Sequence, residues 1–120
     1  MNVAEQILKI LEETGVTQIW GVTGDALNSF TDALQKDEFK IKWNAMRHEE
    51  NGAFAAGAEA QSTGNLAVCA GTVGPGTLHL INGLYNAKKE RVPVLAISGQ
   101  VARVNMGTNY FQEDRTYQNI

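Results

Sequence analysis

The sequence has 120 residues, of which 43% are hydrophobic, 19% charged and 8% aromatic, the composition of one globular domain. Its formal net charge of -3 is too small to draw the protein to nucleic acid or to an anionic membrane surface. No apolar stretch approaches the roughly 20 residues that span a bilayer, so we expect a cytoplasmic protein without a membrane segment. The single cysteine, Cys69, excludes an internal disulfide and fits a reducing compartment.

The first half of the chain predicts two helices and two strands in alternation. Apolar residues spaced three and four apart indicate an amphipathic helix that begins after the capping residue Asn2 and ends at Gly15. A short buried strand is predicted over residues 18–22, and Asp25 follows it in a position to cap the next helix. Alternating apolar and polar residues over 41–45 predict the second strand.

The second half repeats this order with more continuous apolar segments. Closely spaced alanines predict a helix over 49–61, which ends before Gly64. A strand inside the sheet is predicted over 66–70, and the glycine-rich turn 71–76 leads into a further helix. The last strand is predicted over 92–98.

The alternation of strands and helices predicts an α/β fold, in which a parallel sheet carries helices on both faces. Ligands bind at the carboxyl ends of the strands in such folds, and here those ends carry the segments 23–25, 46–50 and 71–76. From Gly99 onward the sequence is polar and lacks a helical period. We therefore expect residues 1–120 to be the front part of a longer protein, because unstructured loops of about 20 residues are uncommon in compact domains.

Several short motifs are excluded by their spacing. The segment 71–76 reads G-x-x-G-x-G rather than G-x-G-x-x-G and lacks the Lys-Ser/Thr pair of a P-loop, which argues against a nucleotide site. His48-Glu49-Glu50 begins like a zinc-protease motif, but Gly52 stands where the second histidine is needed, so no metal site is predicted. Cys69 lies within a predicted strand, so we expect a core side chain rather than a nucleophile.

The informative residue is Glu49, at the junction of a predicted strand and a predicted helix. Helical spacing places Glu49 above the alanines at 53, 56 and 60, and it places Glu50 on a different face with Gly57. Both acids can simply favour the positive end of the helix dipole, a contribution of about 0.3 to 1 kcal/mol. Alternatively, Glu49 points into an apolar cleft, where desolvation lets a carboxyl group exchange a proton near neutral pH.

A longer pattern begins at residues 47–61, which read RHEENGAFAAGAEAQ. It continues, in order, through Gly74-Pro75-Gly76, Asn82-Gly83-Leu84, Val92-Pro93-Val94-Leu95 and Phe111-Gln112-Glu113. Together these segments resemble the pyrimidine-binding domain of thiamine-diphosphate enzymes, and the pyruvate oxidases and quinone-linked pyruvate dehydrogenases most of all. Acetolactate synthases usually continue the glutamate helix as Gly-Tyr-Ala-Arg, which residues 57–61 replace with Gly-Ala-Glu-Ala-Gln.

The resemblance implies roles for individual residues. A glutamate at the position of Glu49 hydrogen-bonds N1′ of the aminopyrimidine ring of the cofactor and so helps the thiazolium C2 carbon to lose its proton. Gly74, Pro75 and Gly76 are implied to pass beside the cofactor. The residues implied on the substrate side are Gly24, Asp25, His79, Phe111 and Gln112. His79 and Phe111 also fit purely structural roles.

The resemblance further implies thiamine diphosphate as the cofactor and the oxidative decarboxylation of pyruvate as the reaction. Mg2+ and FAD are expected only in the full-length enzyme, where separate domains bind the diphosphate and the flavin, so residues 1–120 alone are expected to be inactive. A homodimer or higher homo-oligomer is the expected assembly. Two alternatives stay open, namely an acetolactate synthase-type enzyme and a non-catalytic, stand-alone domain for binding or dimerisation.

Overall fold

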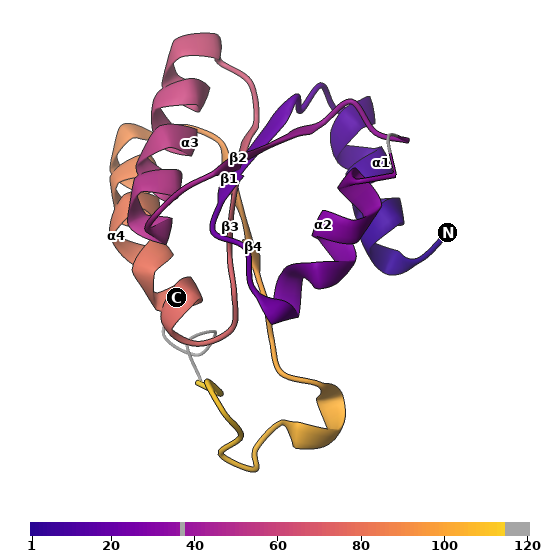
Figure 1. The fold of residues 1–120 in the computed structure, drawn as a ribbon. Helices are drawn as coiled ribbons and strands as arrows, with labels where there is room; N and C mark the ends of the chain where they lie inside the picture. The colour runs from indigo at the N-terminus through magenta and orange to yellow at the C-terminus, as the bar shows by residue number, and fades with distance from the viewer. Residues whose placement is uncertain (37, 115–120) are drawn as a thin grey trace.

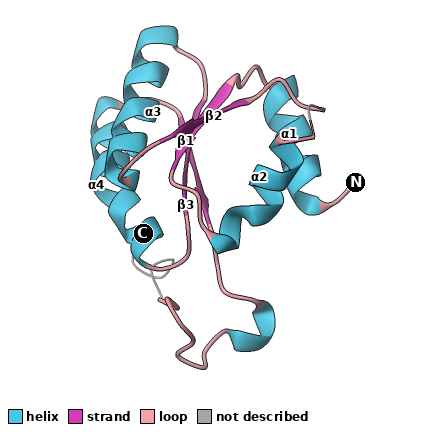
Figure 2. Cartoon of the chain, viewed as in Figure 1, coloured by secondary structure: helices cyan, strands magenta, loops and turns pink. Residues whose placement is uncertain are grey.

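A computed structural model of the chain describes residues 1–36 and 38–114. Four strands form one sheet in the order β2-β1-β3-β4, and every neighbouring pair is parallel. Figure 1 places α1 and α2 on one side of the sheet and α3 and α4 on the other, and Figure 2 shows the same three layers by secondary structure. The predicted α/β fold with helices on both faces is therefore confirmed.

The helices and strands follow the predicted order. Their bounds are α1 Val3–Glu13, β1 Gln18–Gly21, α2 Asn28–Leu34, β2 Lys42–Ala45, α3 Glu49–Thr63, β3 Ala67–Gly71, α4 Pro75–Glu90 and β4 Val94–Ser98. The helix α3 is longer than predicted and ends at Gly64, whose left-handed backbone (φ 72°) suits a residue without a side chain.

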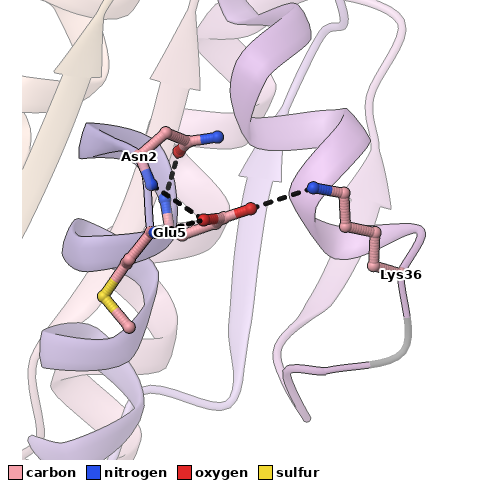
Figure 3. Close-up of polar contacts among 4 residues, drawn as sticks. Asn2, Glu5 and Lys36 are labelled. Carbon is pink, nitrogen blue, oxygen red and sulfur yellow. Dashed lines mark hydrogen bonds and ion pairs between the residues drawn. The ribbon is translucent and has the colours of Figure 1, made fainter.

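The first helix begins at the predicted cap. The side chain of Asn2 accepts a hydrogen bond from the backbone N–H of Glu5 (2.9 Å), and the Glu5 carboxylate accepts one from the backbone N–H of Asn2 (2.8 Å). Lys36, just after α2, donates a third hydrogen bond to Glu5 (2.9 Å), as Figure 3 shows. These bonds from Lys36 and Asn2 lower the pKa of Glu5, so the contact stabilises the fold at neutral pH and is lost as the pH falls into the acid range.

Asp25 does not cap α2 as predicted. It begins a short 3-10 turn, Asp25–Leu27, that precedes the helix, and its side chain makes no capping hydrogen bond. The backbone N–H of Leu27 instead donates to the carbonyl of Gly24 (2.8 Å), and that of Asn28 donates to the carbonyl of Asp25. Backbone carbonyls therefore satisfy the amides that a capping side chain would have taken.

The strand β3 runs through the centre of the molecule and is buried along its whole length. Val68 and Ala70 pack into the core beneath α1 and α2, whereas Ala67 and Cys69 pack into the core beneath α3 and α4. Burial raises the pKa of the Cys69 thiol to about 12, so the thiolate is scarce at neutral pH. Cys69 is a core side chain, as predicted.

The helices α3 and α4 pack closely because small residues line their contact. Ala53 is fully buried, and a Cβ atom at Gly83 would collide with the Ala53 side chain and lie 2.9 Å from its carbonyl carbon. Gly57, predicted on the face of α3 that carries Glu50, is also buried and lies near Ala87. The short distance between the helices brings their first turns together at the carboxyl end of the sheet.

The segment after β4 contains one further 3-10 turn, Arg103–Asn105, and otherwise follows an irregular path through residue 114. The predicted polar segment is thus largely non-helical where the structure describes it, and residues 115–120 lie outside the described part. Within residues 1–36 and 38–114, no helix has both the length and the apolar character that crossing a membrane requires.

The two buried glycines of the α3–α4 contact predict opposite effects of alanine. Gly83→Ala should lower the free energy of unfolding by about 1 to 3 kcal/mol, because the added methyl group overlaps Ala53. Gly57→Ala should leave it unchanged or raise it by about 0.5 to 1 kcal/mol, since its Cβ would lie 3.8 Å from Ala87 and alanine favours a helix. Urea unfolding followed by circular dichroism measures both, and a Gly83→Ala variant as stable as Gly57→Ala would contradict the packing.

Candidate functional site

The candidate site lies where β2 and β3 end and the helices α3 and α4 begin. Glu49 is the first residue of α3 and is buried, with 7% of its surface exposed. The bend Gly74-Pro75-Gly76 follows β3, and Pro75 is the first residue of α4, as its fixed φ favours. His79 lies one turn further along α4. The structure therefore brings Glu49, the glycine bend and His79 together at the ligand-binding edge of a parallel sheet.

Glu49 uses its two carboxylate oxygens differently. Oε2 lies 2.8 Å from Nδ1 of His79, and because an ionised carboxylate only accepts, Nδ1 donates this hydrogen bond. Oε1 accepts no hydrogen bond from any residue in the described part of the chain. The glutamate side chain is 9% exposed and the histidine side chain 44%, so the carboxylate is buried and the imidazole reaches solvent.

The free oxygen of Glu49 faces the glycine bend. A Cβ atom at Gly76 would lie 3.0 Å from Oε1 and 2.9 Å from Cγ2 of Thr72, so any side chain there would crowd the carboxylate. Gly74 has a left-handed backbone (φ 67°), and a Cβ atom there would collide with the backbone carbonyl of Gln112. The bend thus places no side chain against Oε1 at position 76.

His48 belongs to this arrangement, although no motif predicts a role for it there. Its Nδ1 accepts a hydrogen bond from the backbone N–H of Glu50 (3.2 Å) and so caps α3. Its ring stacks on the ring of His79, with centroids 4.2 Å apart and planes 26° apart. The signal for His48 in the sequence was its place directly before Glu49, but the stacking partner lies 31 residues away and could not be read from spacing.

The three side chains also form a possible metal-ligand set, with ligand atoms of His48, Glu49 and His79 within 4.8 Å of one another. The second imidazole that the motif lacked at position 52 is therefore present, supplied by α4. Nevertheless, Nδ1 of His48 accepts from Glu50, so the neutral ring carries its proton on Nε2 and has no lone pair left there. The Nδ1 atoms of both histidines are thus already engaged in hydrogen bonds within the protein.

The residues expected on the substrate side divide into two groups. Asp25, Phe111 and Gln112 line one hollow of about 340 Å3 beside the glycine bend. Gly24 and His79 do not line this hollow: Gly24 packs against Thr72, and His79 contacts Glu49. Phe111 is 79% exposed, so it is not a core residue within the described part of the chain.

Three hydrogen bonds link α4 to the elements around it. The hydroxyl of Thr77 donates to the carbonyl of Thr72 (2.9 Å) and lies 2.6 Å from the hydroxyl of Ser98 at the end of β4. One turn further on, Asn82 donates to the Glu50 carboxylate (3.2 Å) and so links α4 to α3. The first turn of α4 is therefore bonded to the segment after β3 and to the end of β4, and the middle of the helix is bonded to α3.

Comparisons with known proteins agree with the geometry. A family model described as "Thiamine pyrophosphate enzyme, N-terminal TPP binding domain" matches residues 1–120. An uncharacterised 42.6 kDa protein of Pseudomonas amyloderamosa is 53% identical over 112 residues, 93% of this chain and 28% of that protein. A pyruvate oxidase of Lactiplantibacillus plantarum is 46% identical over 107 residues, 89% of this chain and 18% of the oxidase. An acetolactate synthase of Mycobacterium avium is 39% identical over 110 residues, 92% of this chain and 18% of the synthase. The chain thus spans less than a third of the length of each of these relatives.

Proposed function

Because the chain belongs to the thiamine pyrophosphate enzymes, as their N-terminal TPP-binding domain, we propose that Glu49 binds the aminopyrimidine ring of thiamine diphosphate. The observation that carries this proposal is the free Oε1 of a buried glutamate, facing a glycine where a side chain would block it. A ring nitrogen placed at Oε1 would share a proton with the carboxylate in a site largely closed to water. Gly74, Pro75 and Gly76 would flank the ring.

The bound cofactor would supply the electron sink that decarboxylation of a 2-oxoacid requires. The residues of this chain would bind and orient it: Glu49 would hold one proton at Oε1, and the glycine bend would let the ring approach the backbone closely. Asp25, Phe111 and Gln112, which line the neighbouring hollow, would contact the substrate, with Gly24 beside them. Other parts of the full-length enzyme would hold Mg2+ and FAD and would supply the residues that bind the diphosphate.

The proposed role of Glu49 predicts that a conservative substitution strongly slows proton exchange on the cofactor. In the full-length protein, Glu49→Gln should slow the exchange of the C2 proton of bound thiamine diphosphate by about 100-fold to 10,000-fold, because the amide cannot share that proton. Proton NMR of samples quenched after mixing with D2O measures the exchange rate. The matched control is Glu50→Gln, one residue along the same helix, which should exchange at the wild-type rate. Wild-type exchange in Glu49→Gln with the cofactor bound would refute the role.

We favour the oxidative decarboxylation of pyruvate as the reaction. The relative named pyruvate oxidase is 46% identical to this chain, and the one named acetolactate synthase is 39% identical, so identity alone separates them little. Residues 57–61 read Gly-Ala-Glu-Ala-Gln where an acetolactate synthase is expected to have Gly-Tyr-Ala-Arg. This difference lies on α3, the helix that carries Glu49, and it favours the oxidase.

Product analysis separates the candidate reactions. The full-length protein, supplied with thiamine diphosphate, Mg2+, FAD, pyruvate and an artificial electron acceptor, should release CO2 and reduce the acceptor in step. Condensation of two pyruvate molecules would instead yield acetolactate without reducing the acceptor, and a colorimetric assay detects that product. Accumulation of acetolactate would replace the oxidase proposal with the synthase alternative. Absence of any cofactor-dependent turnover would favour a non-catalytic domain.

We also propose that the protein is cytoplasmic, since the lone thiol of Cys69 suits a reducing compartment. We further propose that it forms a homodimer or a higher homo-oligomer. The outer face of α4 carries a stripe of apolar side chains at helical spacing, including Leu78 (46% exposed) and Tyr85 (55% exposed). With Ile81, Leu84 and Lys88, Tyr85 also lines a shallow hollow on this face. A second copy of the protein could cover these side chains and exclude water from them.

The oligomer can be tested at the apolar stripe. Sedimentation equilibrium of the full-length protein at micromolar concentration should give a mass at least twice that of one chain. The double variant Leu78→Lys/Tyr85→Lys should shift this mass toward the monomer, because it places charges in the proposed contact. A matched pair of lysine substitutions at Glu12 and Glu13, on α1 at the other side of the sheet, should leave the mass unchanged. A wild-type monomer would contradict the assembly.

A further inference from the structure

One of the two carboxylate oxygens of Glu49 is already hydrogen-bonded within the protein. Its Oε2 accepts a hydrogen bond from Nδ1 of His79 at 2.8 Å, while Oε1 faces Gly76 without a partner in the described part of the chain. We infer that His79 is a positioning residue, which holds Oε2 so that Oε1 is aimed at the ring nitrogen of the cofactor. This inference rests on the proposed role of Glu49 and adds a residue on which that role depends.

The carboxylate of Glu49 needs such a partner because its immediate surroundings offer few others. The buried positions that follow it on α3 are glycines and alanines, Gly52, Ala53 and Ala56, which cannot hydrogen-bond through their side chains. The positive end of α3 attracts a carboxylate back toward its own backbone amides. A hydrogen bond from an imidazole on the neighbouring helix pulls the carboxylate toward α4, where the glycine bend lies.

The ring of His79 is itself held in place by contacts from α3. His48 is fixed by its capping bond to the backbone N–H of Glu50, and its ring lies against His79 with centroids 4.2 Å apart. The close packing of α3 and α4 at Gly83 sets the distance between the helices. The donor therefore comes from one helix and the acceptor from the other, and their separation is set by the packing rather than by a flexible loop.

The position of His79 also argues against a direct role in contacting the substrate. The hollow lined by Asp25, Phe111 and Gln112 does not include His79 among its lining residues. Its Nδ1 is engaged by Glu49, and the imidazole faces His48 on one side. The contacts of His79 are thus with the glutamate and its helix, as expected of a residue that acts through Glu49.

Binding measurements on the full-length protein test the inference without using activity. The probe pair is thiamine diphosphate and its analogue with a CH group in place of the ring nitrogen N1′, and calorimetry gives the dissociation constant of each. The ratio of the two constants reports the interaction between Glu49 and the ring nitrogen. His79→Phe keeps a ring for stacking but removes the donor, so we expect it to reduce this ratio by about tenfold or more, because a hydrogen bond to a charged group is lost.

Three further variants separate positioning from packing. His79→Asn keeps an N–H donor near the place of Nδ1 and should stay within about threefold of the wild-type ratio. Asn82→Ala removes another polar contact between the same two helices and should leave the ratio unchanged. In a Glu49→Gln background, His79→Phe should have little added effect, because residues that act as one unit are non-additive. If His79→Phe does not fold, His79→Gln, whose longer side chain displaces the donor, replaces it in every comparison.

The outcomes distinguish failure of the positioning role of His79 from failure of the proposed role of Glu49. A wild-type ratio in His79→Phe, an equal loss in Asn82→Ala, or a loss in His79→Phe that persists in full in the Glu49→Gln background would overturn the positioning role while leaving that of Glu49 intact. If Glu49→Gln itself binds both compounds with the wild-type ratio, the proposed function fails, and the inference about His79 fails with it. The ratio must therefore depend on both Glu49 and His79 for the inference to stand.

Discussion

The close approach of α3 to α4 is the constraint on which the candidate site depends. Glycine at 83 and alanine at 53 let the two helix backbones come together where any larger side chain would separate them. Both helices begin at the carboxyl edge of the parallel sheet, so this contact sets the distance between their first turns. Glu49 and His79 form a 2.8 Å hydrogen bond across that distance, although each stands on its own helix.

The two carboxylate oxygens of Glu49 have different surroundings. Oε2 of Glu49 is held by Nδ1 of His79, and Oε1 faces Gly76, where any side chain would crowd it. Under the proposed function, an acceptor held in this way would need little rearrangement when the cofactor ring arrives. The ring of His79 is in turn stacked on the ring of His48.

The family assignment and the geometry describe different parts of one function. The family model covers the whole chain, and the relatives named pyruvate oxidase and acetolactate synthase extend well beyond it. The geometry of the described residues concerns one carboxylate, that of Glu49, which carries the proposed contact with the aminopyrimidine ring. Under the proposed function, the rest of the cofactor would be bound by other parts of the full-length enzyme.

The sequence was enough to predict the order of the helices and strands, the parallel α/β fold, the cap at Asn2 and the place of Glu49 at the start of α3, because each of these depends on local periodicity and nearby residues. It could not determine that Asp25 begins a 3-10 turn, that Gly57 is buried, or that His79 pairs with Glu49 and stacks on His48. The burial of Gly57 and the contacts of His79 depend on how α3 and α4 pack, which residues about 30 positions apart decide, whereas the turn at Asp25 depends on backbone hydrogen bonds within residues 24–28.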